Sequence, residues 1–131
     1  MHRRLLIGRW TVDFLFEVHD YDIEEVLSYF RDIGASTKIT SQAYQLLRSG
    51  SKNTGFTYID ARSKYALVVI GPSDSGDEFI DTLVHEVHHL AVAIAASLGV
   101  DLDGEAPAYL SGDSARELAS IICELGCQCK R

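Results

Sequence analysis

The chain has 131 residues, of which 47% are hydrophobic and 24% are charged, and its formal net charge is −7. This length and apolar content suffice for one domain with a buried core, so we expect a single domain over residues 1–131 without a separate substrate-binding domain. The acidic balance argues against nucleic acid as a partner, because phosphates call for a basic surface. The sequence predicts neither a signal peptide nor a membrane span, so we expect no membrane partner.

The first half of the chain predicts a small α+β arrangement. Apolar residues alternate with other residues from Trp10 to Val18, which is the period-two pattern of a strand buried on one face. One helix is expected from Asp22 to the stop at Gly34, and a second from Thr40 to Arg48. Gly55–Asp60 and Tyr65–Ile70 are rich in β-forming residues, and the short segment between them predicts a hairpin.

A long helix is expected next, from about Asp77 to Leu98. Ser75 to Glu78 has the form of a capping box, and Gly99 can close the other end. Residues placed at 100° intervals give one broad apolar stripe: Phe79, Ile80, Leu83, Val84, Val87, Leu90, Ala91, Ile94 and Leu98. The opposite side carries His85, Glu86 and His89 together with Glu78 and Asp81, so the histidines are not expected in the core.

His85, Glu86 and His89 form an H-E-x-x-H motif on this helix. Histidines four residues apart project from one side of a helix and can share a metal ion, while Glu86 lies where it can take a proton from a metal-bound water. His88 offers a rival pairing with His85, but Glu86 then falls on the far side from the metal. We therefore favour His85 and His89, and the motif indicates metal-dependent hydrolysis.

A further helix is expected to begin around Gly104. Small apolar residues at Val92, Ala93 and Ala96 continue the histidine face, which predicts that this next helix packs over them. Asp103 or Gly104 can cap that helix, and a proline is tolerated in its first turn. It is expected to bring a carboxylate to the metal.

Together these residues resemble the H-E-x-x-H zinc metallopeptidases of the gluzincin group, and the stretches 82–90 and 104–112 are similar to compact zincin-like proteins of phages and mobile elements. In that group two helix histidines and a glutamate from a following helix bind zinc, which implies His85, His89 and Glu105 as ligands of one Zn²⁺. Glu105 to Ala108 matches the glutamate-x-x-alanine signature of small gluzincins. Metzincins are excluded, because the glycine and histidine that they require after the motif are absent.

The third ligand has rivals in Asp101, Asp103 and Asp113. A simple helical hairpin brings Asp113 level with His89 more readily than Glu105, which reaches the metal only if residues 99–103 run back extended. Tyr109, one turn after Glu105, is either a donor to a developing oxyanion or a buried structural tyrosine.

Asp81, one turn before His85, either orients a ligand imidazole or is simply solvated. Cys123, Cys127 and Cys129 form an odd set, which without a signal sequence is typical of reduced thiols in the cytoplasm. Cys127 and Cys129 lack C-x-x-C spacing, so tail cysteines are a better interpretation than a second metal site.

The sequence thus predicts a minimal zincin-like α+β domain whose small antiparallel or mixed sheet packs against the metal-binding helix. The resemblance implies peptide hydrolysis, in which zinc lowers the pKa of a bound water and Glu86 acts as general base. It also places Tyr65–Ile70 at the edge of a substrate cleft, although such an apolar run is also typical of an interior strand. The alternative function is a non-catalytic zincin-like scaffold, such as a phage or mobile-element accessory protein, with a structural metal or a cleft for a partner.

Overall fold

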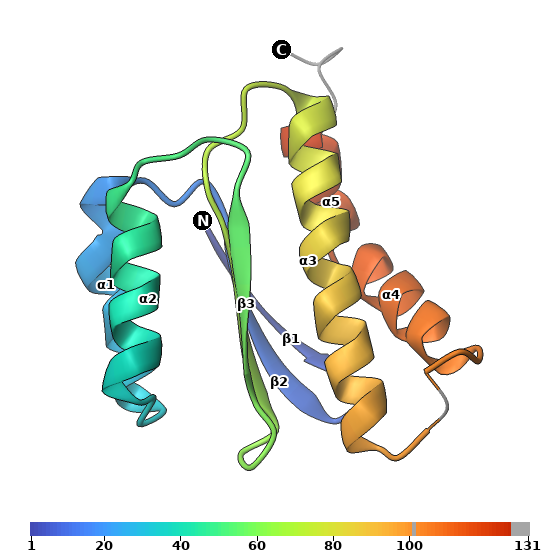
Figure 1. The fold of residues 1–131 in the computed structure, drawn as a ribbon. Helices are drawn as coiled ribbons and strands as arrows, with labels where there is room; N and C mark the ends of the chain where they lie inside the picture. The colour runs from blue at the N-terminus through green and yellow to red at the C-terminus, as the bar shows by residue number, and fades with distance from the viewer. Residues whose placement is uncertain (101, 127–131) are drawn as a thin grey trace.

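A four-stranded mixed sheet forms the centre of the molecule, which is a computed structural model that describes residues 1–100 and 102–126 (Figure 1). The strand order is β1-β2-β4-β3. β1 and β3 run antiparallel to their neighbours β2 and β4, which lie parallel to each other. The strands are β1 (His2–Ile7), β2 (Trp10–Leu15), β3 (Gly55–Asp60) and β4 (Tyr65–Ile70).

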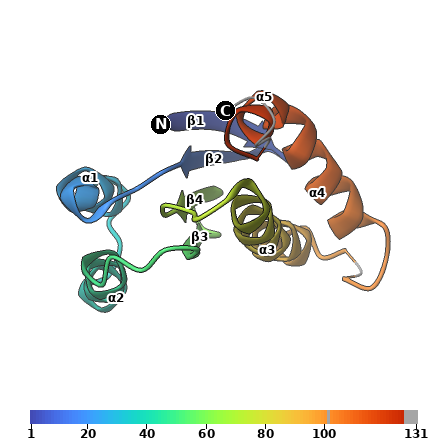
Figure 2. The ribbon, with the colours of Figure 1, turned by 90° about the horizontal axis from the view of Figure 1, so that it is seen from above.

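Helices cover both faces of this sheet (Figure 2). On one face lie α1 (Ile23–Asp32) and α2 (Thr37–Arg48), preceded by the 3₁₀ turn η1 (Asp20–Asp22). On the other face lie α3 (Gly76–Ser97), α4 (Ala106–Glu117) and the short α5 (Ala119–Ile121), followed by the π-helical turn η2 (Ile122–Gly126). The expected α+β class with a small mixed sheet is confirmed.

Each face of the sheet has its own hydrophobic core. Side chains alternate across a strand, so neighbouring residues of β2 and β4 enter different cores. The core under α3 includes Val12, Phe14, Val68, Ile70, Leu83, Val87, Leu90 and Ile94. The core under α1 and α2 includes Leu15, Leu67, Val69, Val26, Phe30, Ala43 and Leu47.

The prediction that the first strand is buried on one face only is wrong. Asp13 and Leu15, expected on an open face, are 0% and 4% exposed. The reason is that β2 is an interior strand with helices above and below it. β1, which pairs with β2 along its whole length, is a strand that the sequence pattern did not predict.

Helix α3 begins and ends close to the predicted residues. The Ser75 Oγ accepts a hydrogen bond from the Glu78 amide at 3.2 Å, and Gly99 follows the helix with a positive φ of +70°. The predicted apolar stripe is too wide, because Val84 and Leu98 are 61% and 53% exposed.

α4 packs beside α3 and β1, but not over the histidine face. Leu110 of α4 belongs to the same core cluster as Ala91 and Ala95, whereas Ala96 is exposed. The expected cover does not extend to Ala96, whereas Val92 and Ala93 are half-buried. The predicted cap is wrong, because Glu105 occupies the N-cap position and makes no side-chain capping bond.

By length and composition, α3 is long and apolar enough to cross a membrane, contrary to the expectation from the sequence. Half of its most apolar window is buried inside the fold. Such burial is the pattern of a core helix in a soluble protein, and the fold as a whole is compatible with solubility.

Candidate active site

His85 and His89 lie one turn apart on the exposed side of α3, and their imidazole rings meet edge to face. Their two Nε2 atoms are 3.1 Å apart. Two nitrogens bound to one tetrahedral zinc at about 2.0–2.1 Å are separated by about 3.3 Å, so little movement separates this arrangement from that of a ligand pair. His88 is exposed, and its ring centroid lies 6.3 Å from that of His89. The geometry thus favours the His85–His89 pairing.

Glu86 is buried, although the sequence predicted it on the same non-core face of the helix as His85 and His89. It is 5% exposed, and its Oε1 accepts a hydrogen bond from the Thr57 hydroxyl at 2.8 Å. Its Oε2 lies 3.9 Å from the His85 Nε2. The side chain therefore sits between the histidine pair and β3, because a residue a quarter turn from His85 faces the neighbouring strand.

Gly55 makes room for this carboxylate side chain. A Cβ at residue 55 would lie 3.2 Å from the Glu86 Cγ and 2.7 Å from the backbone oxygen of Val69. A larger residue could not occupy this position without a shift of the backbone. The glycine thus permits the close approach of β3 to α3.

A hollow of about 470 Å³ lies between α3 and β3. It is lined by Gly55, Phe56, Thr57, Ile59, His85, Glu86 and His89. The histidine pair and the carboxylate thus face one space that is open to a ligand.

Within residues 1–100 and 102–126, no strand pairs with the outer edge of β3. The Gly71 amide donates a hydrogen bond to the Thr54 oxygen at 2.9 Å. Hydrogen-bonded and non-hydrogen-bonded residue pairs alternate along an antiparallel ladder. The backbone N–H and C=O groups of Gly55, Thr57 and Ile59 therefore point away from β4. Figure 1 views the molecule from this free edge, with α2 on one side and α3 on the other. The prediction that Tyr65–Ile70 forms the cleft edge is wrong, because β4 pairs on both sides and β3 is the edge strand next to it.

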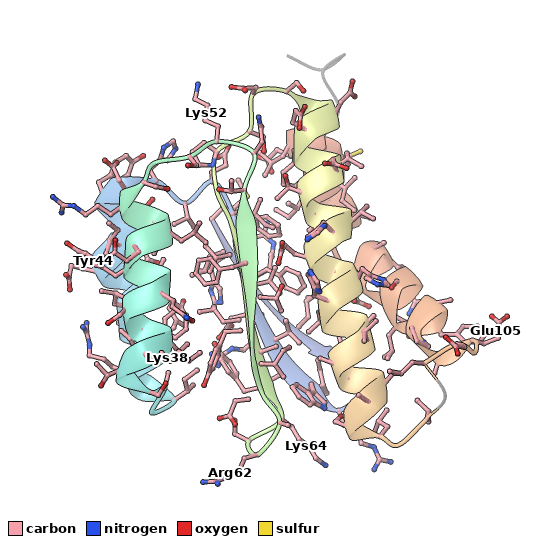
Figure 3. The ribbon with its side chains drawn as sticks, viewed as in Figure 1. Lys38, Tyr44, Lys52, Arg62, Lys64 and Glu105 are labelled. Atoms are coloured by element: carbon pink, nitrogen blue, oxygen red, sulfur yellow. The ribbon has the colours of Figure 1, made fainter. Side chains whose placement is uncertain are left out.

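The structure does not bring the predicted third ligand to the histidines. Glu105 is exposed at the N-cap of α4, and its side chain points outward, away from α3 (Figure 3). Among residues 1–100 and 102–126, no three histidine, cysteine, aspartate or glutamate side chains form a group able to hold a metal. Tyr109 is 68% exposed on α4, so its interpretation as a buried structural tyrosine is wrong.

The rival third ligands that the structure describes, Asp103 and Asp113, are both exposed. Asp113 is exposed and pairs with Arg116 at 3.2 Å. Asp103 and Asp81 are exposed, which for Asp81 agrees with the solvated interpretation. Cys123 is exposed on η2. Asp101, Cys127 and Cys129 lie outside the described residues.

A second polar cluster, which sequence reasoning missed, surrounds Asp13 on the opposite side of the sheet. Its Oδ1 accepts from the His2 Nε2 at 2.7 Å and from the Arg4 Nε at 2.8 Å. Its Oδ2 accepts from a terminal Arg4 nitrogen at 2.8 Å and from the Tyr65 hydroxyl at 2.7 Å. Burial raises the pKa of Asp13, but hydrogen bonds from Arg4, His2 and Tyr65 outweigh it and bring the pKa down to about 2. Burial and the hydrogen bond to Asp13 raise the pKa of Tyr65.

Thr57 and Gly55 were also missed. In the sequence they look like ordinary members of a β-rich run, and the only signal was that both fall on the same side of a period-two strand. The chain matches no protein-family model, no curated protein and no solved structure.

Proposed function

We propose that the protein is a zinc-dependent hydrolase that cleaves peptides, with His85 and His89 as zinc ligands and Glu86 as general base. The observation that carries this proposal is the approach of the two Nε2 atoms to 3.1 Å, with the Glu86 carboxylate 3.9 Å from one of them. A structural metal site has no need of an adjacent carboxylate that stays outside the ligand set.

The donor atoms suit the metal. Imidazole nitrogen is a common ligand of zinc, and a catalytic zinc site has three protein ligands and one open position. The third ligand is proposed to be Glu105 on the resemblance to gluzincins alone. It reaches the histidines only if the segment between α3 and α4 takes another path.

Zinc, when bound, polarises the scissile carbonyl and lowers the pKa of a water molecule. Glu86 would serve there as general base, taking a proton from the attacking water and returning it to the leaving amine. The Oε2 atom is suited to this transfer, because Oε1 already accepts a hydrogen bond from Thr57 while Oε2 faces His85.

The free edge of β3 supports a peptide as substrate. An extended peptide can add to an exposed strand through main-chain hydrogen bonds, and the outward backbone groups of Gly55, Thr57 and Ile59 offer such bonds next to the hollow. A cytoplasmic location is proposed from the odd number of cysteines.

A second candidate is a non-catalytic zincin-like scaffold whose cleft binds a partner. The position of Glu105 favours it, because a site with only two protein nitrogens in place is incomplete for catalysis. The two candidates differ in whether Glu86 has a chemical role.

Replacement of Glu86 by glutamine tests this role. The amide keeps the shape of the side chain but cannot act as a base, so Glu86→Gln should keep the bound zinc and lower peptide hydrolysis by about 10²- to 10⁴-fold. The assay is cleavage of a broad peptide library by zinc-loaded protein. If the wild type binds zinc but cleaves no peptide, the scaffold is the better description; if the variant cleaves as fast as the wild type, Glu86 is not the base.

A further inference from the structure

The hydroxyl of Thr57 contacts two oxygens of one residue, Glu86. It lies 2.8 Å from the carboxylate Oε1 and 3.3 Å from the backbone oxygen. A hydroxyl has one proton to donate, and a charged acceptor makes the stronger hydrogen bond. The proton of Thr57 therefore goes to the carboxylate, whose residue is 5% exposed.

This contact makes the two carboxylate oxygens different. The terminal torsion of a glutamate is broad, so a free carboxylate samples many orientations. Here the Thr57 hydroxyl holds Oε1 through its hydrogen bond. Oε2 is left on the side of His85, 3.9 Å from its Nε2.

We propose that Thr57 is a positioning residue, which orients the Glu86 carboxylate so that Oε2 faces the place where the proton is transferred. This inference rests on the proposed function, since it assigns a role in the same reaction. Thr57 does not touch the reacting atoms; it acts through Glu86.

The backbone of Thr57 has a separate task. Its outward amide and carbonyl belong to the free edge of β3, where the proposed peptide substrate would pair with the main chain. Main-chain pairing does not depend on the hydroxyl. Loss of the hydroxyl should therefore affect proton transfer, and hence kcat, while KM changes little.

Thr57→Val and Thr57→Ser test the proposal. Valine has the shape of threonine without the donor, so with a peptide cleaved by the wild type it should lower kcat by about 10- to 100-fold, leaving KM within about twofold and zinc content unchanged. Serine keeps the donor and should restore kcat to within about threefold of the wild type. Thr11→Val, on the interior strand β2, is the matched control and should leave kcat unchanged. Wild-type kcat in Thr57→Val overturns the proposal while leaving the proposed function intact.

A second measurement does not depend on activity. A double-mutant cycle of Thr57→Val and Glu86→Met is read by urea unfolding. The effect of the double substitution on the unfolding equilibrium constant should differ by about tenfold from the product of the two single effects. Additive effects would mean that the hydroxyl does not hold the carboxylate, and the proposal fails. If the wild type cleaves no peptide at all, the proposed function fails, and the cycle alone then decides whether Thr57 orients Glu86.

Discussion

The carboxylate of Asp13 offers the sharpest test of the energetics of this fold. We expect Asp13→Asn to destabilise the protein near neutral pH by about 2–3 kcal/mol. The side chain is fully buried, and both oxygens accept from Arg4. Whichever oxygen an amide nitrogen replaces, it faces an Arg4 N–H, and two donors cannot bond to each other.

The magnitude follows from the ion pair with Arg4 and from the pKa of Asp13. Breaking one side of a buried ion pair costs about 3–5 kcal/mol, but the Arg4 side chain is 61% exposed and can turn into water, which lowers the cost. The pKa of Asp13 falls from 3.8 to about 2 on folding, which corresponds to about 2 kcal/mol of stability.

The pKa also fixes the pH dependence. Because the folded pKa of Asp13 lies below the unfolded pKa, its contribution is complete above about pH 5 and is lost as the pH falls through 3.8 toward 2. At pH 3 about 1 kcal/mol of it should be gone, so the stability difference between wild type and Asp13→Asn should narrow by that amount. Other carboxylates are common to both proteins and cancel in the comparison.

Urea unfolding at pH 7, 5 and 3, followed by the fluorescence of the single tryptophan, measures these differences. Trp10 is 1% exposed and lies on the same strand as Asp13, so its fluorescence reports the unfolding of the sheet. Asp32→Asn, an exposed position on α1, is the control and should change stability by less than about 0.5 kcal/mol. A difference between wild type and Asp13→Asn that is the same at pH 7 and pH 3 would refute the reasoning.

Three further predictions concern the candidate site. His85→Ala should abolish the binding of about one equivalent of zinc, measured by metal analysis, whereas His88→Ala should retain it; full zinc content in the first variant would rule out the assigned pair. Glu105→Gln should weaken zinc binding far more than Asp113→Asn, and the reverse order would show that the resemblance to gluzincins misassigned the third ligand. Gly55→Ala should destabilise the protein by about 1–3 kcal/mol in urea unfolding, since its Cβ would lie 2.7 Å from a backbone oxygen of β4; wild-type stability would mean that β3 moves away easily.

Sequence signals that act within one element predicted the structure well. The boundaries of the hairpin strands Gly55–Asp60 and Tyr65–Ile70 are those expected, because alternation and turn residues are local properties. The same holds for the long helix and for the side-by-side arrangement of His85 and His89, which follows from helix geometry alone.

Features that depend on pairing between distant segments were not predictable. The sequence contains no local signal that β2 pairs with β4, and this pairing decides that β4 is interior, that β3 is the edge and that Asp13 is buried. Likewise Glu86 is buried because its side chain packs against β3 and contacts Thr57, a residue 29 positions away in the chain. Helix periodicity predicts the side of the helix from which a side chain projects, but not which residue of another element it contacts.

The parallel contact between β2 and β4 has a consequence for how the chain folds. β1 with β2 and β3 with β4 are hairpins that close over short loops, and such hairpins form in about 1–10 μs. The parallel ladder instead joins Thr11 to Tyr65 and Leu15 to Val69, so a long loop that contains α1, α2 and β3 must close before any of its hydrogen bonds forms. The two hairpins therefore form early, and their docking along this central seam limits the folding rate. Before the two hairpins dock, the apolar edges of β2 and β4 are both exposed, so this stage of folding is the one most prone to aggregation.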